Sequence, residues 1–541
     1  MAPVVKRPLC GPAQESRRGD RLGLMSVVID PAFDPVPSLA HSTRVSVSPA
    51  PPEGSAAAAV FVASEGELPG DLAEVGRDAL AAAGFTGAAN QTLLLPGTPL
   101  RVLVGTGKSE IETDAQLRDA VAAFARAARE AGRLAVDLTG ILAAGDWDAE
   151  VAVQAAIEGA VLARYRYDAL KSDPSTVALD ELMLQIGDEH VEAAEYGVER
   201  GLVLARTAAI ARDLANTPPR HLSAVKFAEV IERLAPEFGL EVEVFDREAL
   251  MELGTGGLLG VNAGSIEEPR MVKVSYRPAD ADGYLALIGK GIMYDSGGIS
   301  LKPSNAMHAA MKFDMMGAAA VFASMTALRD LGTKTAVTGW LMCTDNMPSG
   351  SATKLGDVLT IRGGKTVEVK NTDAEGRLVM ADGLVLATEE ERRPDAIVDI
   401  ATLTGAAMMA LGTRTAAMLA NNDAVADQLQ AAADATDENI WRFPLDHRYR
   451  DQLKSSTADL SNIGGQYAGV ILAGLFLNEF VDGLPWGHLD IAGTMQAEND
   501  DLWRSTGSTG FGARLLAEFA AGFEAPDTGE TDTESGETDE A

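Results

Sequence analysis

The chain has 541 residues with 45 Lys and Arg against 79 Asp and Glu, and its formal charge of −34 argues against broad binding to nucleic acids or anionic membranes. A hydrophobic content of 46% with only 5% aromatic residues is typical of a globular protein with an aliphatic core, and the length allows two to four domains. The sequence has no run of about 18 apolar residues that would predict a membrane span, and Cys10 and Cys343 form no disulfide framework, so we expect a cytoplasmic protein.

Both ends of the chain have the composition of disordered segments. Residues 1–40 are rich in Pro, Gly and charge, and no apolar core of signal-peptide length follows their basic residues. We therefore expect a disordered leader without a secretion signal. Residues 524–541 contain eight acidic residues and no basic residue, which predicts a solvated, disordered tail.

From residue 41 to residue 188, short β-branched runs alternate with helical patterns. Residues 114–131 and 149–170 have the spacing or the Ala content of helices, and Gly132 stands where the first should end. The runs that predict strands are residues 44–48, 58–63, 92–95, 101–104 and 133–137. This alternation predicts an amino-terminal α/β domain.

A long helical pattern follows, and residues 189–219 are predicted to connect two domains. The pattern runs from Glu189 to Ala215 and stops at Asn216-Thr-Pro-Pro219. Proline lacks the backbone donor that a helix needs and restricts the residue before it, so the helix cannot continue through this motif.

Residues 220–523 repeat the alternation and predict a second, larger α/β domain. Between its strands, residues 315–329 predict a helix that Asp314 caps and Gly332 ends. Strands joined by helical crossovers imply a mixed, mainly parallel sheet flanked by helices, with its site at the carboxyl ends of the strands. The predicted strands are residues 240–245, 271–275, 284–288, 336–342 and 396–400.

Two segments of this second domain, residues 289–303 and 371–378, place charged residues between glycines, and each is predicted to follow a strand directly. In the second segment, Asp373, Glu375 and Arg377 stand at i, i+2 and i+4. On an extended backbone this spacing puts the three side chains on one side, and the alternating run before Asn371 favours an extended segment. Two carboxylates on one face repel each other unless a positive group lies between them, so we expect a bound metal.

The same residues can support hydrolysis. The carboxylates provide enough oxygen ligands for two divalent ions that share a bridging carboxylate, activate a water and polarise a carbonyl. A lysine buried near these cations would become a neutral amine that can bind a metal. The carboxylates are Asp295, Asp314, Asp373 and Glu375, and the lysine is Lys290.

Lys302 and Arg377 are expected to remain charged and to stabilise the oxyanion of a tetrahedral intermediate. Neither charged segment contains a histidine, which is the usual general base. We therefore expect a bound anion, held by Arg377, to carry the proton.

The motif Asn371-Thr-Asp-Ala-Glu-Gly-Arg-Leu378, together with Gly289-Lys-Gly and Asp295-Ser-Gly-Gly, resembles the cytosolic leucyl aminopeptidase family, the M17 metallopeptidases. The likeness extends from about Arg212 to Gly493, whereas the amino-terminal domain matches only in general organisation. The resemblance implies that residues 220–523 are a catalytic peptidase domain. It would remove the amino-terminal residue, preferably Leu or another apolar residue, from small peptides during intracellular peptide turnover.

The resemblance also implies a role for each site residue. Lys302 and Arg377 would be the catalytic pair, with bicarbonate near Arg377 as the proton shuttle, and Asp295 and Glu375 would bridge two ions, Mn²⁺ or Zn²⁺. The implied metal ligands are Lys290, Asp295, Asp314, Asp373 and Glu375, and the implied substrate-pocket residues are Met311, Thr402, Leu403 and Gly405. The family likeness further suggests a homo-oligomer, a hexamer built from two trimers.

Two other functions stay open. A dinuclear site can also cleave phosphoesters or other amides, and an activity panel with and without a chelator would separate these reactions. Some relatives of the family also act as DNA-binding architectural proteins, a role that needs a basic groove. The formal charge of −34 opposes that role.

Overall fold

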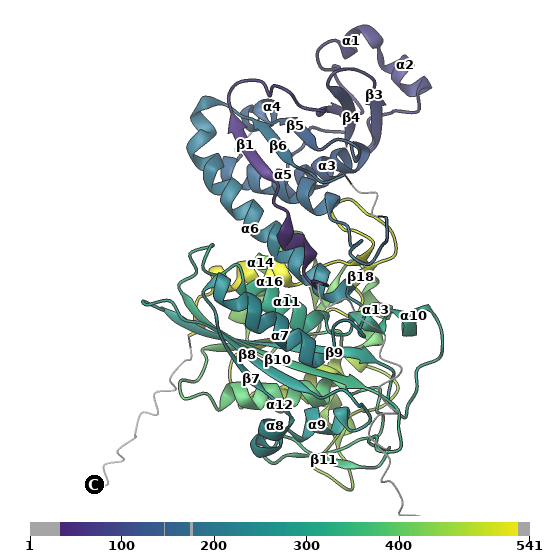
Figure 1. Cartoon of the computed structure of the whole chain (residues 1–541), viewed down its shortest axis with the longest axis vertical. Helices are drawn as coiled ribbons and strands as arrows, with labels where there is room; N and C mark the ends of the chain where they lie inside the picture. Colours follow the sequence, from purple (N-terminus) through teal and green to yellow (C-terminus); the bar gives the residue numbers. More distant parts are fainter. Residues whose placement is uncertain (1–32, 145–146, 174–176, 528–541) are drawn as a thin grey trace, which may run out of the picture. The chain divides into compact units, whose positions relative to one another are not determined.

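The computed structural model describes residues 33–144, 147–173 and 177–527, which contain two large sheets with helices packed on them (Figure 1). Most of the predicted leader, including Cys10, and most of the predicted tail lie outside these residues. At the end of the predicted leader, the 3-10 helix η2 (Pro37–Ala40) follows a buried Val36, and the Ser38 amide donates to Asp213 Oδ2 at 2.8 Å. No helix in the described ranges combines the length and apolar content needed to cross a bilayer.

The first sheet has six strands in the order β1-β6-β5-β2-β4-β3, and all its pairs are parallel except β3 with β4. Helices α3 (Asp114–Ala127) and α5 (Ala149–Arg164) pack against it, and the side chains of Thr113 and Asp148 cap their first turns. The strands are β1 (Arg44–Ser48), β2 (Ala57–Ala63), β3 (Thr92–Leu95), β4 (Leu100–Gly107), β5 (Arg133–Asp137) and β6 (Glu181–Gln185). The predicted α/β alternation of this region is confirmed.

The second sheet has eight strands in the order β15-β14-β17-β13-β9-β10-β8-β7. Its central strands β17, β13, β9 and β10 are parallel, whereas β7 and β8 are antiparallel to their neighbours and β14 is antiparallel to β17. The strands are β7 (Glu241–Phe245), β8 (Arg270–Tyr276), β9 (Gly283–Asp295), β10 (Thr335–Asn346), β13 (Ala396–Ala401), β14 (Ala416–Ala420), β15 (Ile440–Arg442) and β17 (Trp486–Asp490). The predicted mixed, mainly parallel sheet is therefore confirmed.

Helices cover both faces of the second sheet (Figure 1). Four helices cover one face, and their apolar side chains pack into one large buried cluster. Four other helices cover the opposite face and pack around Ile288 and Trp340. The first group is α7 (Ala224–Leu234), α11 (Met316–Met325), α14 (Asp423–Thr436) and α16 (Ala513–Ala521), and the second is α8 (Arg247–Leu253), α9 (Gly256–Asn262), α12 (Gly376–Thr388) and α15 (Gly469–Asn478).

Helix α6 (Val191–Asn216) lies between the elements of the two sheets, packing against both α5 and α11. It ends at Asn216, where the two prolines that follow were predicted to stop it. The described residues from Pro35 to Asp527 belong to one compact unit that contains both sheets. The domain boundaries at residues 41–188, 189–219 and 220–523 stay predictions.

Three predicted boundaries in the second domain are wrong. The strands predicted at residues 284–288 and 336–342 continue to Asp295 and Asn346, because β9 and β10 stay paired that far. Gly289 lies inside β9, where α11 approaches so closely that a Cβ would lie 2.6 Å from the Ala318 Cα. The helix predicted at residues 315–329 is α11, which ends at Met325, and Met315 rather than Asp314 occupies its N-cap position. The first charged segment therefore begins inside a strand.

The fully buried Glu158 joins helices of the two sheets through ion pairs. Its Oε2 accepts hydrogen bonds from Arg118 Nε on α3, at 2.9 Å, and from Arg514 Nη1 on α16, at 2.6 Å. Arg118 and Arg514 are also buried. One buried carboxylate thus pairs with two buried guanidinium groups, and Asp114, 3.5 Å from Arg118, and Glu438, 3.6 Å from Arg514, balance the remaining positive charge.

We expect Glu158→Ala to lower the free energy of unfolding by about 3–5 kcal/mol, because it leaves buried charges without their partner. Urea unfolding followed by circular dichroism would measure the change. Glu189→Ala is the matched control, since the Glu189 side chain is 73% exposed. Equal unfolding midpoints for Glu158→Ala and the control would contradict the expected role of the ion pairs.

Candidate metal centre

The candidate site lies at the carboxyl ends of neighbouring parallel strands. Strand β9 ends at Asp295 and β10 ends at Asn346, and the two residues are paired in register. Strand β13, on the other side of β9, ends at Ala401 and is followed by Thr402. This edge of a parallel sheet is where the crossover connections leave room for a ligand.

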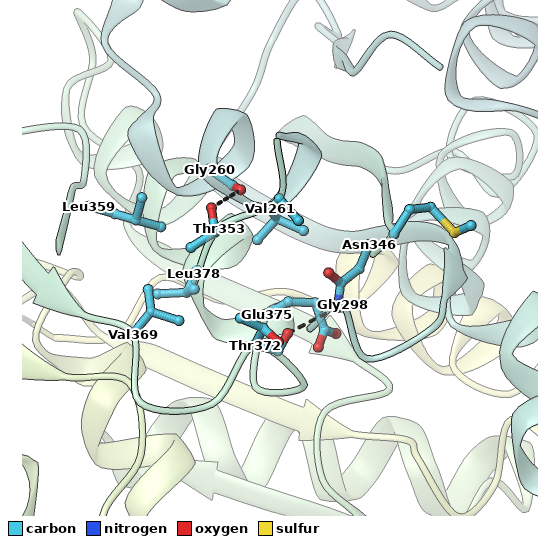
Figure 2. A pocket seen from close by; sticks show the side chains of 12 residues that line it. Gly260, Val261, Gly298, Asn346, Thr353, Leu359, Val369, Thr372, Glu375 and Leu378 are labelled. Atoms are coloured by element: carbon cyan, nitrogen blue, oxygen red, sulfur yellow. Dashed lines mark hydrogen bonds between the residues drawn. The ribbon is translucent and has the colours of Figure 1, made fainter. Parts of the chain in front are cut away.

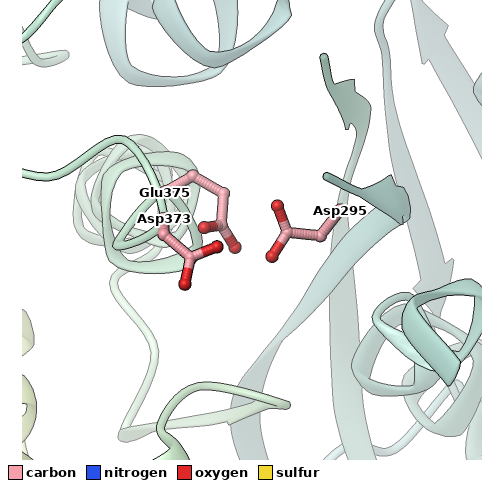
Figure 3. Close-up of side chains that lie close together, drawn as sticks. All are labelled: Asp295, Asp373 and Glu375. Carbon is pink, nitrogen blue, oxygen red and sulfur yellow. The ribbon is translucent and has the colours of Figure 1, made fainter. Parts of the chain in front are cut away.

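Three carboxylates face one another at this edge, as Figure 3 shows. Oxygens of Asp295, Asp373 and Glu375 all lie within 4.8 Å of one another. The prediction that residues 371–378 are extended is wrong: Asp373 lies in a turn, Glu375 is the N-cap residue of α12, and Arg377 is in its first turn. The carboxylate of Glu375 is favoured there because the amino-terminal end of a helix carries partial positive charge.

Two lysine side chains lie among these carboxylates. Lys290 Nζ is 2.8 Å from Asp314 Oδ1, 2.8 Å from Glu375 Oε1 and 2.9 Å from the Thr402 carbonyl oxygen. Lys302 Nζ is 2.9 Å from Asp295 Oδ2 and 2.7 Å from Asp373 Oδ1. The Lys290 side chain is 3% exposed and that of Lys302 is 18% exposed, so only Lys302 offers a face to solvent.

Asp314 is not one of the three clustered carboxylates, and it is linked to Glu375 through Lys290. It follows the 3-10 helix η5 (Ala310–Phe313), and its Oδ1 also accepts a hydrogen bond from Thr402 Oγ1 at 2.6 Å. Asp314 does not cap α11 as predicted, because its side chain turns to Lys290 and Thr402 instead. The structure thus brings together all five predicted metal-ligating side chains.

The pKa values of these groups reflect an excess of buried negative charge. Burial raises the pKa of Glu375 to about 8, with a further contribution from Asp295, and burial raises the pKa of Asp314 to about 6. Burial also raises the pKa of Asp373. Burial alone would lower the pKa of Lys290, but the charges of Asp314, Glu375 and Asp295 outweigh it and raise the pKa above its ordinary value.

The donor set fits a divalent cation. Asp314 Oδ2 and Glu375 Oε2 are buried, and neither has a hydrogen-bond partner among the described residues. Buried carboxylate oxygens without partners are costly unless a cation or proton satisfies them. Without a metal ion, the neighbouring carboxylates raise the pKa of Lys290 and keep its side chain charged. Lys290 would therefore become a neutral amine only when a cation binds next to it.

Asn346 is a site residue that the sequence did not reveal. Its Nδ2 donates to Asp295 Oδ1 at 2.8 Å and to the Thr372 carbonyl oxygen at 3.0 Å, so it joins the two charged segments. Thr372 adds a second link by donating to the Gly297 carbonyl oxygen at 2.7 Å. The polar pair Asp345 and Asn346 at the carboxyl end of β10 was a local signal of a site there, but it did not single out Asn346.

The residues predicted for the substrate pocket lie around the same site to different degrees. Met311 is buried in η5, three residues before Asp314, and Thr402 contacts Asp314 directly. The amide of Leu403 donates to Asp490 Oδ1 at 3.0 Å, and its Cδ1 is near Gly376, where an added Cβ would lie at 3.0 Å. Gly405 begins α13 (Gly405–Leu411) and is exposed.

A small cavity lies behind Glu375, bordered by Asn346, Thr372 and Leu378 (Figure 2). Its volume of about 10 Å³ is room for a single water at most. Substrate pockets are far larger, roughly 300 Å³ or more. This cavity is therefore not the substrate pocket.

We expect Asn346→Ala to weaken binding of Mn²⁺ by about tenfold to a hundredfold, the usual effect of removing a group that orients a metal ligand. Calorimetric titration of Mn²⁺ into the metal-stripped protein would measure the change. Asn439→Ala, at an exposed position outside the site, is the control. If Asn346→Ala bound Mn²⁺ as tightly as the control, the support of Asp295 by Asn346 would be unimportant.

Two family models match the chain. Residues 209–517 match the catalytic domain of the cytosol aminopeptidase family, and residues 54–174 match its N-terminal domain. A probable cytosol aminopeptidase of Streptomyces coelicolor is 44% identical over 472 residues, which cover 82% of this chain and 89% of that relative.

Solved structures are similar over most of the chain. The bottromycin maturation enzyme BotP in complex with Mn has a TM-score of 0.79 and 38% identity, covering 86% of this chain and 99% of that chain. A mutant of tomato leucine aminopeptidase has a TM-score of 0.78 and 28% identity, covering 89% of this chain and 96% of that chain. The similarity in sequence and the similarity in fold therefore agree.

Proposed function

This chain belongs to the cytosol aminopeptidase family and is a metal-dependent aminopeptidase, and from that premise we propose that it removes Leu and other apolar residues from the amino termini of small peptides. The observation that carries the proposal is the cluster of buried carboxylates around Lys290 and Lys302 at the carboxyl ends of the strands. Such a site is suited to hydrolysis at a polarised carbonyl. We place its activity in the cytoplasm, in peptide turnover.

Two divalent ions, Mn²⁺ or Zn²⁺, held at this edge of the sheet would supply an activated water and polarise the scissile carbonyl. The side chains that would hold them are Lys290, Asp295, Asp314, Asp373 and Glu375. Two observations support this ligand set: the unpartnered oxygens of Asp314 and Glu375, and the short distances among the oxygens of Asp295, Asp373 and Glu375.

Lys302 is suited to stabilise the oxyanion that forms during hydrolysis. Its ammonium is fixed by Asp295 and Asp373, and its side chain is the more exposed of the two lysines. The charges of these carboxylates raise the pKa of Lys302 although burial opposes this, so the side chain stays charged at neutral pH. A charged donor held in position before the reaction lowers the barrier to oxyanion formation.

Arg377 is suited to hold an anion. The guanidinium lies against the Phe476 ring, 6.0 Å from its centroid, and its Nε has no hydrogen-bond partner among the described residues. Burial lowers the pKa of Arg377 to about 10, which leaves it charged at neutral pH. We assign a bicarbonate to this guanidinium, whose planar donors match a carboxylate-like anion, as the proton carrier in a site without histidine.

Apolar side chains support the preference for Leu. Met311 stands three residues before Asp314, which Thr402 contacts, and Leu403 follows Thr402 and lies near Gly376, so both are suited to offer hydrocarbon surface to the first side chain of a peptide. Thr402 and Gly405 would complete this pocket. Burial of an apolar substrate side chain against such surface favours binding by roughly 1.5–3 kcal/mol.

We expect Leu-p-nitroanilide to be hydrolysed and its N-acetylated form to resist hydrolysis. The lone pair of a free amine would bind one of the two proposed ions while the carbonyl is polarised, and acetylation makes that nitrogen an amide that cannot bind this way while adding bulk. Steady-state rates with the two substrates at saturating Mn²⁺ would test this. Equal rates would rule out an exopeptidase.

Lys290→Ala and Lys302→Ala should both lower the activity, but for different reasons. Loss of Lys290 should weaken metal binding, so excess Mn²⁺ should restore part of the activity. Loss of Lys302 should leave the metal content intact and lower the turnover number by about a hundredfold to a thousandfold, the usual cost of losing an oxyanion donor. Titration of Mn²⁺ against activity would separate the two, with the exposed Lys354→Ala as the control. Rescue of Lys302→Ala but not of Lys290→Ala would reverse the assigned roles.

We also propose that the protein is a homohexamer of two trimers with its active sites facing an interior cavity. The support is the family membership, and an enclosed site would explain a restriction to small peptides. Light scattering at micromolar concentration should give six times the monomer mass. A monomer under these conditions would contradict the proposal, and so would rapid digestion of large folded proteins.

A further inference from the structure

The 3-10 helix η5 presents one side to the candidate site. A 3-10 helix has three residues per turn, so side chains at i and i+3 eclipse each other. Met311 and Asp314 have this spacing, and the amide of Asp314 donates to the Met311 carbonyl oxygen at 3.3 Å. The proposed pocket residue and the proposed metal ligand therefore share one side of this turn, and Lys312 points elsewhere.

Lys312 fastens η5 to the end of the long helix α6. Its Nζ donates to the backbone carbonyl oxygen of Asn216 at 3.0 Å, and the ammonium lies 4.9 Å from the centroid of the buried Phe313 ring. Burial lowers the pKa of Lys312, as expected for an ammonium that has exchanged water for a carbonyl. The contact spans 96 residues of sequence.

Asn216 is itself fixed by other parts of the chain. Its Oδ1 accepts from the Ser508 amide at 3.0 Å, and its Nδ2 donates to the Tyr165 hydroxyl at 3.3 Å. Tyr165 also donates to Asp213 Oδ1 at 2.8 Å. Two segments far apart in sequence, at Tyr165 and Ser508, thus hold the side chain of the residue whose carbonyl Lys312 contacts.

The positions of Met311 and Asp314 depend to different degrees on the hydrogen bond between Lys312 and Asn216. Asp314 is held by Lys290 at 2.8 Å and by Thr402 Oγ1 at 2.6 Å, so its position does not require Lys312. The Met311 side chain belongs to a buried apolar cluster, and a thioether packs there without directional contacts. Slippage of η5 would therefore displace Met311 more than Asp314.

We infer that Lys312 is a positioning residue that sets the preference for large apolar side chains, by fixing Met311 against the carbonyl of Asn216. The inference rests on the proposed pocket role of Met311. A Leu side chain would reach Met311 and an Ala methyl group would not, so loosening η5 affects the two substrates unequally.

Lys312→Met removes the ammonium while keeping the hydrocarbon stem, and Lys312→Arg keeps a donor. With Mn²⁺ saturating, we expect Lys312→Met to lower the ratio of kcat/KM for Leu-p-nitroanilide over Ala-p-nitroanilide by roughly threefold to tenfold, a fraction of what an apolar pocket can discriminate. The loss should appear as a raised KM for the Leu substrate. Lys312→Arg should restore the ratio, and bound Mn²⁺ per chain should stay unchanged by mass spectrometry.

Lys226→Met is the matched control, because it removes an exposed ammonium paired with Glu229 on α7. An unchanged Leu-to-Ala ratio in Lys312→Met would overturn the inference, as would equal losses for both substrates accompanied by loss of Mn²⁺. Should Lys312→Met not fold, Lys312→Leu, which also lacks a donor, carries the same expectation. If the wild-type protein shows no preference for Leu over Ala, both the proposed pocket and this inference are overturned. If the wild type prefers Leu, a change of that preference in Lys312→Met tests the role of Lys312 alone.

Discussion

Like charges crowded into a buried space are the constraint around which the second domain is arranged. Four carboxylates, at the end of β9, directly after η5 and in the turn before α12, converge at one edge of the sheet. Three of them are buried and Asp373 is half-buried, and each raises the cost of ionising its neighbours. Lys290 and Lys302 offset this repulsion, each by touching two of the four side chains. The excess negative charge that persists is the property that makes the site a receptor for cations.

The fold could be predicted where the chain carries a strong local pattern. The strands at 44–48, 92–95 and 133–137 were placed without error, because apolar and β-branched runs are bounded there by turn residues. The strand Ala416–Ala420 was missed, since Ala-Ala-Met-Leu-Ala has no β-branched residue and reads equally well as helix. This segment is a strand because it pairs with β17, and the local sequence does not encode that pairing. The helices predicted to end at residues 131 and 170 stop at Ala127 and Arg164, because the residue pattern alone locates a helix end only to within a few residues.

The composition of the site was more predictable than its geometry. Residues 373, 375 and 377 were expected on an extended backbone, yet Gly376 begins a helix whose first turn approaches Lys290 so closely that a Cβ would lie 2.7 Å from its Cε. Asp373 and Glu375 still meet Asp295, because the turn before the helix aims both at the same strand end. Asn346 could not be singled out in advance, since its importance comes from lying in register with Asp295 on the adjacent strand.

Because the carboxylates repel one another, the surrounding structure must hold each of them in place. Asp295 is held by the paired ends of β9 and β10 and by the Asn346 amide, Glu375 by the start of α12, and Asp314 by Thr402. Rigid elements keep the carboxylates close even though separation would lower their energy, which is how binding sites are preorganised at a cost in stability. Bound cations would relieve that repulsion in the folded state only, because the unfolded chain has no such cluster. The same charge that destabilises the metal-free fold therefore supplies the driving force for binding the ions.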